Sequence, residues 1–227
     1  MCEGVVSQTK YRLVIFDLDG TILNTLEDLA DSVNYALTKN KCPNRTIEEV
    51  RKFVGNGIHK LIERAVLPET DEGLIEKVYT DFGAYYKEHC ADKTRPYDGI
   101  VELIECLREK GMLTAVVSNK ADFAVRKLCE QYFPGLFDFV VGEREGIRRK
   151  PAPDSVLEVL STLQIAKREV LYVGDSDVDI QTAKNAGLDQ ISVAWGFRDA
   201  AFLRAHGAEY IVKEPGEIFG YTKGRES

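Results

Sequence analysis

The sequence has few of the residue patterns that mark zinc proteins and membrane proteins. Its five cysteines form no C-x-x-C pair, no H-E-x-x-H motif occurs, and the three histidines stand far apart. The common zinc sites are therefore excluded, and no histidine is assigned a catalytic role. No run approaches the roughly 18 consecutive apolar residues of a membrane-spanning helix, so no membrane partner is expected.

Positive charge is also scarce. The 227 residues include 30 Lys and Arg against 37 Asp and Glu, which gives a formal net charge of −7. Nucleic-acid binders usually carry a basic face, so a nucleic-acid partner is not expected. The first residues, MCEGVVSQTKYR, lack the apolar segment of a signal peptide, and we expect a cytoplasmic protein.

Two nucleotide-binding motifs are missing as well. The phosphate-binding pattern G-x-x-x-x-G-K-[ST] does not occur, which excludes P-loop kinases. Gly55 and Gly57 resemble the start of a dinucleotide-binding G-x-G-x-x-G pattern, but Lys60 stands where the third glycine belongs. A dinucleotide enzyme is therefore disfavoured.

The chain does contain a regular alternation of short apolar runs and helical patterns. Near-continuous apolar runs are typical of parallel strands covered on both faces, and helices between them indicate a doubly wound α/β sheet. Six such runs predict strands, at Tyr11–Phe16, Leu113–Val117, Phe137–Val141, Val170–Val173, Ile191–Ala194 and Tyr210–Val212. Three of the helices between them are predicted over Gly99–Lys110, Pro153–Leu163 and Asp177–Ala186.

One segment interrupts the alternation. Residues 23–94 contain successive helical patterns and no convincing strand, so they predict a small helical domain inserted into an α/β domain of residues 1–22 and 95–227. Thr25 and Asp28 resemble a capping box at the start of its first helix. Further helices are expected to begin near Thr46, Gly57 and Asp71.

Polar residues follow four of the predicted strands. The first strand leads into Asp17-Leu-Asp19-Gly20-Thr21, where the two carboxylates project to the same side of an extended chain. Another strand leads into Gly-Asp175-Ser-Asp-Val-Asp179. Each cluster alone is equally compatible with a turn or a helix cap.

The remaining two strand ends offer a hydroxyl with an amide, in Ser118 and Asn119, and a lysine, Lys150. Ligands bind at the carboxyl ends of strands in open α/β sheets, so these side chains are expected to meet. Together they predict an anion site beside a hard-cation site. Oxygen ligands select Mg²⁺, which we expect as the cofactor.

These four motifs, in this order, resemble those of the haloacid dehalogenase superfamily. The resemblance extends from about Arg12 to Val212 and implies a Rossmann-like core with a helical cap inserted after the first motif. Finer motifs resemble the phosphoglycolate phosphatase branch. They include the segments Val54–Gly57, Lys150–Asp154 and Trp195–Phe197.

The resemblance also implies roles for the motif residues. Asp17 would be the nucleophile that forms an aspartyl-phosphate, and Asp19 the general acid and then base, with Lys150 neutralising charge. The metal would be bound by Asp17, by the backbone carbonyl of Asp19 and by Asp175, with Asp179 in an outer contact. The remaining candidates, for substrate binding, are Thr21, Ser118, Asn119 and, in a cap loop that is equally an ordinary turn, Gly55 and Asn56.

The implied function is a Mg²⁺-dependent phosphatase for a small phosphorylated metabolite, 2-phosphoglycolate or a similar monoester. A sugar phosphomutase, a nucleotidase or a pyrophosphatase of the same superfamily are the alternatives. A non-enzymatic scaffold is disfavoured because Asp17, Asp19 and Lys150 are all present. The partner is expected to be the metabolite alone, bound by a monomer or a homodimer.

Overall fold

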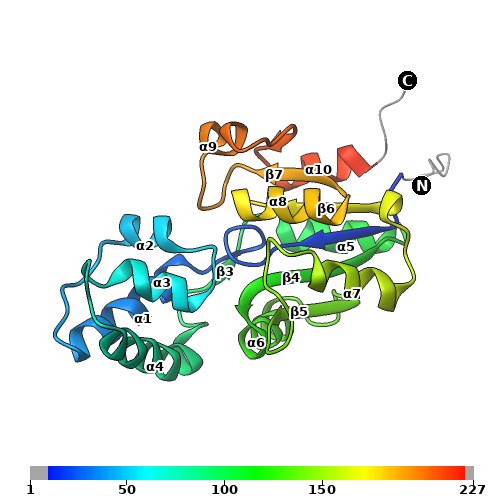
Figure 1. The fold of residues 1–227 in the computed structure, drawn as a ribbon. Helices are drawn as coiled ribbons and strands as arrows, with labels where there is room; N and C mark the ends of the chain where they lie inside the picture. The colour runs from blue at the N-terminus through cyan, green and yellow to red at the C-terminus, as the bar shows by residue number, and fades with distance from the viewer. Residues whose placement is uncertain (1–9, 223–227) are drawn as a thin grey trace.

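The computed structural model describes residues 10–222 and consists of an α/β core beside a group of four helices (Figure 1). This arrangement agrees with the predicted fold class, a doubly wound core with a helical cap. Within the described residues, no helix is long and apolar enough to cross a membrane.

The core is built on one six-stranded sheet. Its strand order is β5-β4-β1-β6-β7-β8, and all neighbouring strands are parallel. All six predicted strands are present, as β1 Leu13–Phe16, β4 Leu113–Ala121, β5 Phe139–Glu143, β6 Val170–Gly174, β7 Asp189–Val193 and β8 Ile211–Val212. Phe16 at the end of β1 lies opposite Val116 of β4 and Val173 of β6. The segments that follow these three strands therefore meet at one edge of the sheet.

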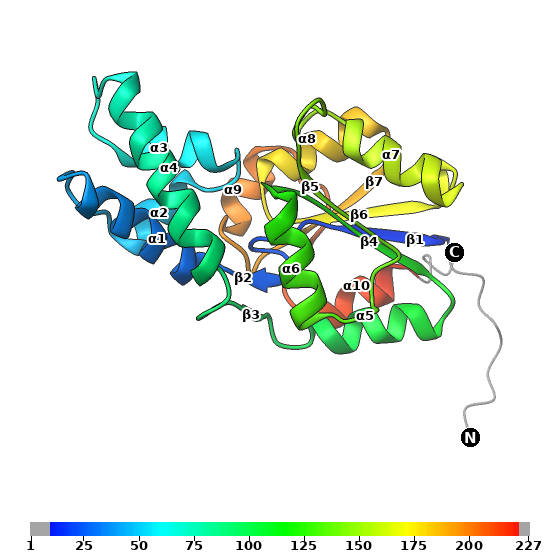
Figure 2. The same cartoon turned by 90° about the horizontal axis from the view of Figure 1, so that it is seen from below.

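Helices cover both faces of the sheet (Figure 2). Leu13 and Ile15 of β1 belong to the apolar cluster under α7 and α8, whereas Val14 and Phe16 belong to the cluster under α5 and α10. This alternation explains why β1 reads as a continuous apolar run. The core helices are α5 Ile100–Glu109, α6 Asp122–Tyr132, α7 Asp154–Leu163, α8 Asp177–Ala186, α9 Ala200–Ala205 and α10 Pro215–Thr222, with a short 3₁₀ helix over Lys167–Glu169.

The cap consists of four helices with the predicted starting points. Thr46 and Asp71 each accept a hydrogen bond from the backbone of the first helical turn, and Gly57 is the residue before the third helix. The helices are α1 Leu26–Lys39, α2 Ile47–Phe53, α3 Ile58–Ala65 and α4 Glu72–His89. Their apolar faces pack into a cluster that is continuous with one face of the core.

The predicted capping box at Thr25 is wrong. Thr25 precedes α1, but its side chain makes no capping hydrogen bond and instead donates to Asp19 Oδ1 at 2.7 Å. The carboxylate of Asp28 accepts from the backbone N–H groups of Lys93 and Thr94. Both side chains therefore form hydrogen bonds to residues outside α1, and these bonds replace the predicted capping box.

The two connections between core and cap pair with each other, which the sequence analysis did not predict. β2 Leu23–Asn24 and β3 Arg95–Pro96 form a short antiparallel ribbon at the predicted exits of the helical segment. Strands of two residues are too short to show a periodic pattern. The ribbon ties the beginning and the end of the cap to one place on the core.

Candidate active site

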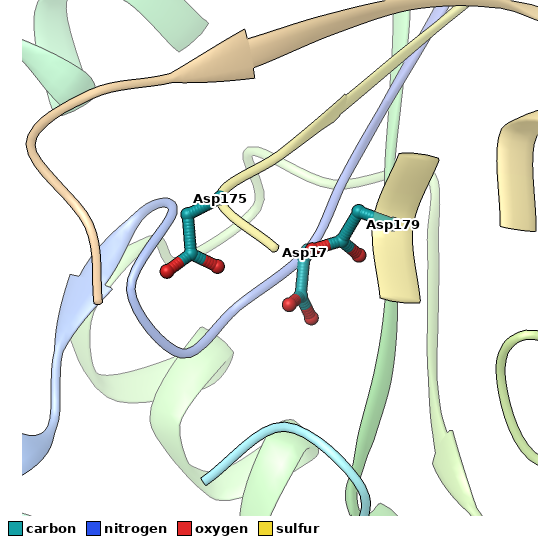
Figure 3. A group of neighbouring side chains, drawn as sticks. All are labelled: Asp17, Asp175 and Asp179. Carbon is teal, nitrogen blue, oxygen red and sulfur yellow. The ribbon is translucent and has the colours of Figure 1, made fainter. Parts of the chain in front are cut away.

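Three carboxyl groups meet where the central strands end. Asp17 follows β1 directly, Asp175 follows β6, and Asp179 lies in the first turn of α8. All three are buried, and one oxygen from each lies within 4.8 Å of the others. Figure 3 shows Asp179 extending from α8 toward Asp17, with Asp175 on the other side of Asp17 in that view.

Lys150 is the cation that faces this cluster. It lies in the loop between β5 and α7, and its buried Nζ is 2.9 Å from Asp17 Oδ1 and 2.8 Å from Asp179 Oδ1. A third contact, at 3.2 Å, joins it to the hydroxyl of Tyr172. Burial opposes the charge of Lys150, but the two carboxylates outweigh it and hold its pKa well above the ordinary value.

The carboxyl cluster carries more negative charge than Lys150 can balance. Burial is the largest cause that raises the pKa of Asp17 to about 7, with Lys150 opposing it and Asp179 adding to it. Burial, followed by the charges of Asp179 and Asp17, raises the pKa of Asp175 well above its ordinary value. A divalent cation would remove this excess, and an all-oxygen donor set fits Mg²⁺.

The loop after β1 passes close to Asp175. Gly20 has a φ of +82°, and a β-carbon there would lie 2.3 Å from Asp175 Oδ2, so only glycine fits. The Thr21 hydroxyl is 3.5 Å from Asp175 Oδ1, and the backbone N–H of Phe197 donates to Oδ2 at 2.6 Å. Thr21 therefore supports Asp175 and does not line the cavity described below.

Asp19 has different partners from Asp17. Its Oδ1 accepts from the Thr25 hydroxyl at 2.7 Å and from Lys120 Nζ at 2.8 Å. Among the described residues, no hydrogen bond reaches its Oδ2. The two carboxylates of the first motif are thus separated, Asp17 toward Lys150 and Asp19 toward Lys120.

Ser118, Asn119 and Lys120 belong to β4, at the place where its pairing with β5 is interrupted. The Asn119 carboxamide accepts from the backbone N–H of Lys150 at 2.8 Å and donates to the carbonyls of Lys150 and Gly55 at 3.0 and 3.2 Å. Asn119 therefore fixes the Lys150 loop and touches the cap.

A cavity of about 50 Å³ lies between the carboxyl groups and the cap. Its core side includes Asp17, Asp19, Ser118, Asn119, Lys120, Lys150, Asp175 and Arg198, and its cap side consists of Leu29, Val54, Gly55, Gly57, Ile58, Leu61 and Tyr86. Asn56 is not among the lining residues, since its side-chain oxygen accepts from Arg64. The cap thus presents an almost wholly apolar wall.

Core arginines hold the cap loop closed over this cavity. Arg198 donates to the carbonyls of Arg51 and Val54, both at 2.8 Å, and Arg149 donates to that of Asn56 at 3.0 Å. Gly57, with a φ of +82°, approaches so closely that a β-carbon would lie 2.7 Å from Arg149 Nη1.

Sequence reasoning missed Lys120, Tyr86 and Arg198 as cavity residues. Lys120 directly follows Ser118 and Asn119, and Arg198 directly follows the Trp195–Phe197 motif, so position next to a motif was the available signal. Tyr86 lies in a cap helix with no motif nearby, and nothing in the sequence singled it out.

Comparison with known proteins identifies the class. The sequence model of the haloacid dehalogenase-like hydrolase family matches residues 14–193. The chain therefore belongs to this family, and its relatives establish it as a phosphoric monoester hydrolase.

Its relatives include several phosphatases. A phosphoglycolate phosphatase from Haemophilus influenzae is 35% identical over 83% of this chain and 88% of its own length. An N-acetylmuramic acid 6-phosphate phosphatase from Pseudomonas aeruginosa is 30% identical over 94% and 95%. A crystal structure from Lactobacillus delbrueckii, of a protein assigned as a phosphoglycolate phosphatase, is 39% identical over 95% and 100%, with a TM-score of 0.89.

Proposed function

We propose that this protein is a Mg²⁺-dependent phosphatase that hydrolyses a small phosphate monoester, 2-phosphoglycolate or a close analogue, through an aspartyl-phosphate. The observation that carries the proposal is the placement of Asp17. Its buried carboxylate ends the central strand, lines the cavity and lies 2.9 Å from Lys150 Nζ. The relatives named as phosphoglycolate phosphatases support the choice of substrate.

The carboxyl cluster is the proposed metal site. Asp17 and Asp175 would bind Mg²⁺ through their side chains and Asp19 through its backbone carbonyl, while Asp179 would stay in an outer contact. Asp179 fits that outer role because it does not line the cavity and accepts from Lys150 and Ser176. When bound, the metal would supply positive charge that offsets the repulsion between Asp17 and the phosphoryl group.

The first step is an attack by a carboxylate oxygen of Asp17 on phosphorus. The bond between phosphorus and the leaving oxygen breaks, and Asp19 gives that oxygen a proton. Asp19 Oδ2 suits this task because Thr25 and Lys120 both hold the other oxygen. In the second step water attacks phosphorus, Asp19 takes its proton, and Asp17 is released from the phosphate.

The remaining residues position these groups. We assign the phosphoryl oxygens to the Ser118 hydroxyl, because both amide protons of Asn119 are already donated to backbone carbonyls. Lys150, whose protons are directed at Asp17, Asp179 and Tyr172, would act through its charge. Asn119 would hold Lys150 and the cap loop at Gly55. Thr21 would keep Asp175 in place.

The cap wall favours a small leaving group. Among the cavity residues contributed by the cap, Tyr86 carries the one polar side-chain group. Sugar hydroxyls that face the other cap residues would find no side-chain hydrogen-bond partner, which is unfavourable and argues against a phosphomutase. We place the enzyme in the cytoplasm, acting on a metabolite as a monomer or homodimer.

A phosphate-release screen tests the proposal. The substrates are 2-phosphoglycolate, N-acetylmuramic acid 6-phosphate, glucose 1-phosphate, a nucleoside monophosphate and pyrophosphate, each with Mg²⁺ and with excess EDTA. We expect the highest kcat/KM for 2-phosphoglycolate, and release only with Mg²⁺. Isomerisation of the sugar phosphate with little release would instead show a mutase.

A further inference from the structure

Lys120 is a buried cation in the cavity to which the proposed reaction gives no direct task. Its side chain is 2% exposed, and it lines the cavity beside Asp19. Lys150, the other cavity lysine, makes three contacts, with Asp17, Asp179 and Tyr172. Lys120 Nζ donates to Asp19 Oδ1 at 2.8 Å, and it also interacts with the Tyr86 hydroxyl. An ammonium group has three protons to donate, so at least one remains for a ligand.

Tyr86 lies on the other side of Lys120. The Lys120 ammonium is 4.7 Å from the centre of the Tyr86 ring, within the range of a cation–π contact. Tyr86 is 1% exposed and lines the cavity from α4, and its hydroxyl makes no well-aligned hydrogen bond among residues 10–222. Among those residues, its one hydrogen-bonding neighbour is Lys120, an ammonium that can only donate, so the proton of the hydroxyl has no acceptor there. Buried polar groups are normally paired, so a hydroxyl without an acceptor beside an ammonium with a spare proton indicates a missing anionic or polar ligand.

The position of this pair relative to Asp19 defines which part of the substrate it faces. Asp19 must reach the leaving oxygen in the proposed reaction, and Lys120 is in direct contact with Asp19. The phosphoryl end of the cavity already has Lys150 and Ser118. Lys120 and Tyr86 therefore lie beside the leaving group, in a wall that is otherwise apolar on the cap side.

We propose that Lys120 and Tyr86 form a specificity site for a carboxylate carried by the leaving group, one carbon away from the leaving oxygen. Lys120 donates to this carboxylate with a proton that neither Asp19 nor Tyr86 uses, and the Tyr86 hydroxyl donates from the cap. The site selects esters of 2-hydroxy acids over uncharged alkyl esters of the same size. This inference rests on the proposed phosphatase function and adds the residues that choose the substrate.

The test compares 2-phosphoglycolate with ethyl phosphate, which has the same number of carbons and no carboxylate. Tyr86→Phe removes one hydroxyl and keeps the ring under Lys120. We expect it to lower the ratio of kcat/KM for phosphoglycolate to that for ethyl phosphate about tenfold, since a hydrogen bond to a charged group is lost. Tyr85→Phe is the matched control, because Tyr85 is on the same helix and stacks on Tyr35 and His89 away from the cavity. It should leave the ratio unchanged.

Lys120→Met should lower activity on both esters, because Asp19 loses a partner, and should lower the ratio further than Tyr86→Phe does. A ratio that is unchanged in both variants overturns the proposal. Equal losses on both esters in Tyr86→Phe would also overturn it, because they would show that the hydroxyl only supports the fold.

A binding measurement separates this proposal from the proposed function. In an Asp17→Asn background the esters bind without being cleaved, and calorimetry gives their affinities with and without Tyr86→Phe. Weaker binding of phosphoglycolate alone supports the carboxylate site even if the wild-type protein cleaves neither ester. If the wild type hydrolyses both esters but the Asp17→Asn protein binds them with equal affinity, the carboxylate site is overturned and the phosphatase function stands.

Discussion

The polar groups at the two ends of the cavity differ in how far they are paired with one another. At the phosphoryl end, Asp17 follows β1, Asp179 lies in the first turn of α8, and Lys150 lies in the loop before α7. Lys150 Nζ contacts both carboxylates. At the leaving-group end, Tyr86 lies in an otherwise apolar cap wall next to Lys120, and each of the two retains an unused donor. In the proposed reaction the first end would accept a phosphoryl group from any ester, and discrimination between esters would take place at the second end.

The largest effect is expected at the phosphoryl end. Asp17→Asn should reduce turnover of every ester to background, because the amide cannot form the phosphoenzyme. No labelled protein should be trapped after brief incubation with a phosphorylated substrate, whereas the wild type should be labelled. Asp177→Asn is the control, since Asp177 lies in the other acidic segment, between Asp175 and Asp179, but does not line the cavity. Residual turnover comparable to the control would contradict the assignment of the nucleophile.

Metal removal should abolish activity at the same end, and its effect on stability should depend on pH. Since the pKa of Asp17 is raised to about 7, chiefly by burial, the folded metal-free protein holds a proton that the unfolded chain releases near pH 4. The contribution of this group to stability therefore falls as pH rises between about 4 and 7. Mg²⁺ competes with that proton, so we expect it to raise the Tm little at pH 5 and more at pH 8.

Thermal denaturation with and without Mg²⁺ at the two pH values measures this difference. NaCl at matched ionic strength controls for general salt effects. An equal rise in Tm at pH 5 and pH 8 would contradict linkage to the carboxyl cluster, and full turnover in excess EDTA would contradict the metal requirement itself.

The difference between the two ends of the cavity also explains how much could be predicted from the sequence. Asp17, Asp175 and Lys150 follow apolar runs or lie in recognisable loops, and parallel strands bring their ends together. That geometry is set by the sheet, so short-range patterns were enough to predict that these residues lie together. Their roles in the reaction remain predictions.

The leaving-group end could not be predicted in this way. Lys120 and Asp19 are 101 positions apart, and Tyr86 reaches them from a cap helix whose packing no local pattern specifies. Thr25 shows most directly that a local sequence pattern does not determine a side chain's hydrogen-bond partner. Its sequence context is that of a helix cap, yet the hydroxyl bonds Asp19 because a charged tertiary partner is the stronger acceptor.

Asp19 stands between the two ends, so its replacement should have an intermediate effect that depends on the ester. Asp19→Asn keeps the nucleophile and loses the proton donor, which is typically worth about 10²- to 10⁴-fold. The loss should be severe for phosphoglycolate, whose alkoxide needs a proton, and milder for p-nitrophenyl phosphate, whose phenolate leaves unaided. Phosphoenzyme should accumulate with the activated ester, because water has lost its base. Equal losses on both esters, with no trapped intermediate, would contradict the role of Asp19.

The smallest effect is expected for the contacts that hold the cap in place. Arg198 comes from the core, yet it donates to carbonyls at the end of α2 in the cap, where a positive charge also meets the negative end of the helix dipole. Arg198→Gln should weaken cap closure and raise KM about five- to tenfold, the value of a hydrogen bond from a charged group that is partly exposed to solvent. The kcat should change little, because no group at the phosphoryl end moves.

This prediction tests the comparison between the two ends of the cavity, because Arg198→Gln and Tyr86→Phe should have different effects on the kcat/KM ratio of the two esters. Cap closure shields any bound ester from water, so Arg198→Gln should raise KM for phosphoglycolate and ethyl phosphate alike and leave their ratio unchanged. Arg204→Gln is the control, since Arg204 is an exposed arginine on the neighbouring α9. Steady-state kinetics with the two esters measures both KM values and the kcat/KM ratio. If Arg198→Gln lowered the phosphoglycolate ratio instead, Arg198 would be a second carboxylate ligand, and discrimination would not be confined to Lys120 and Tyr86.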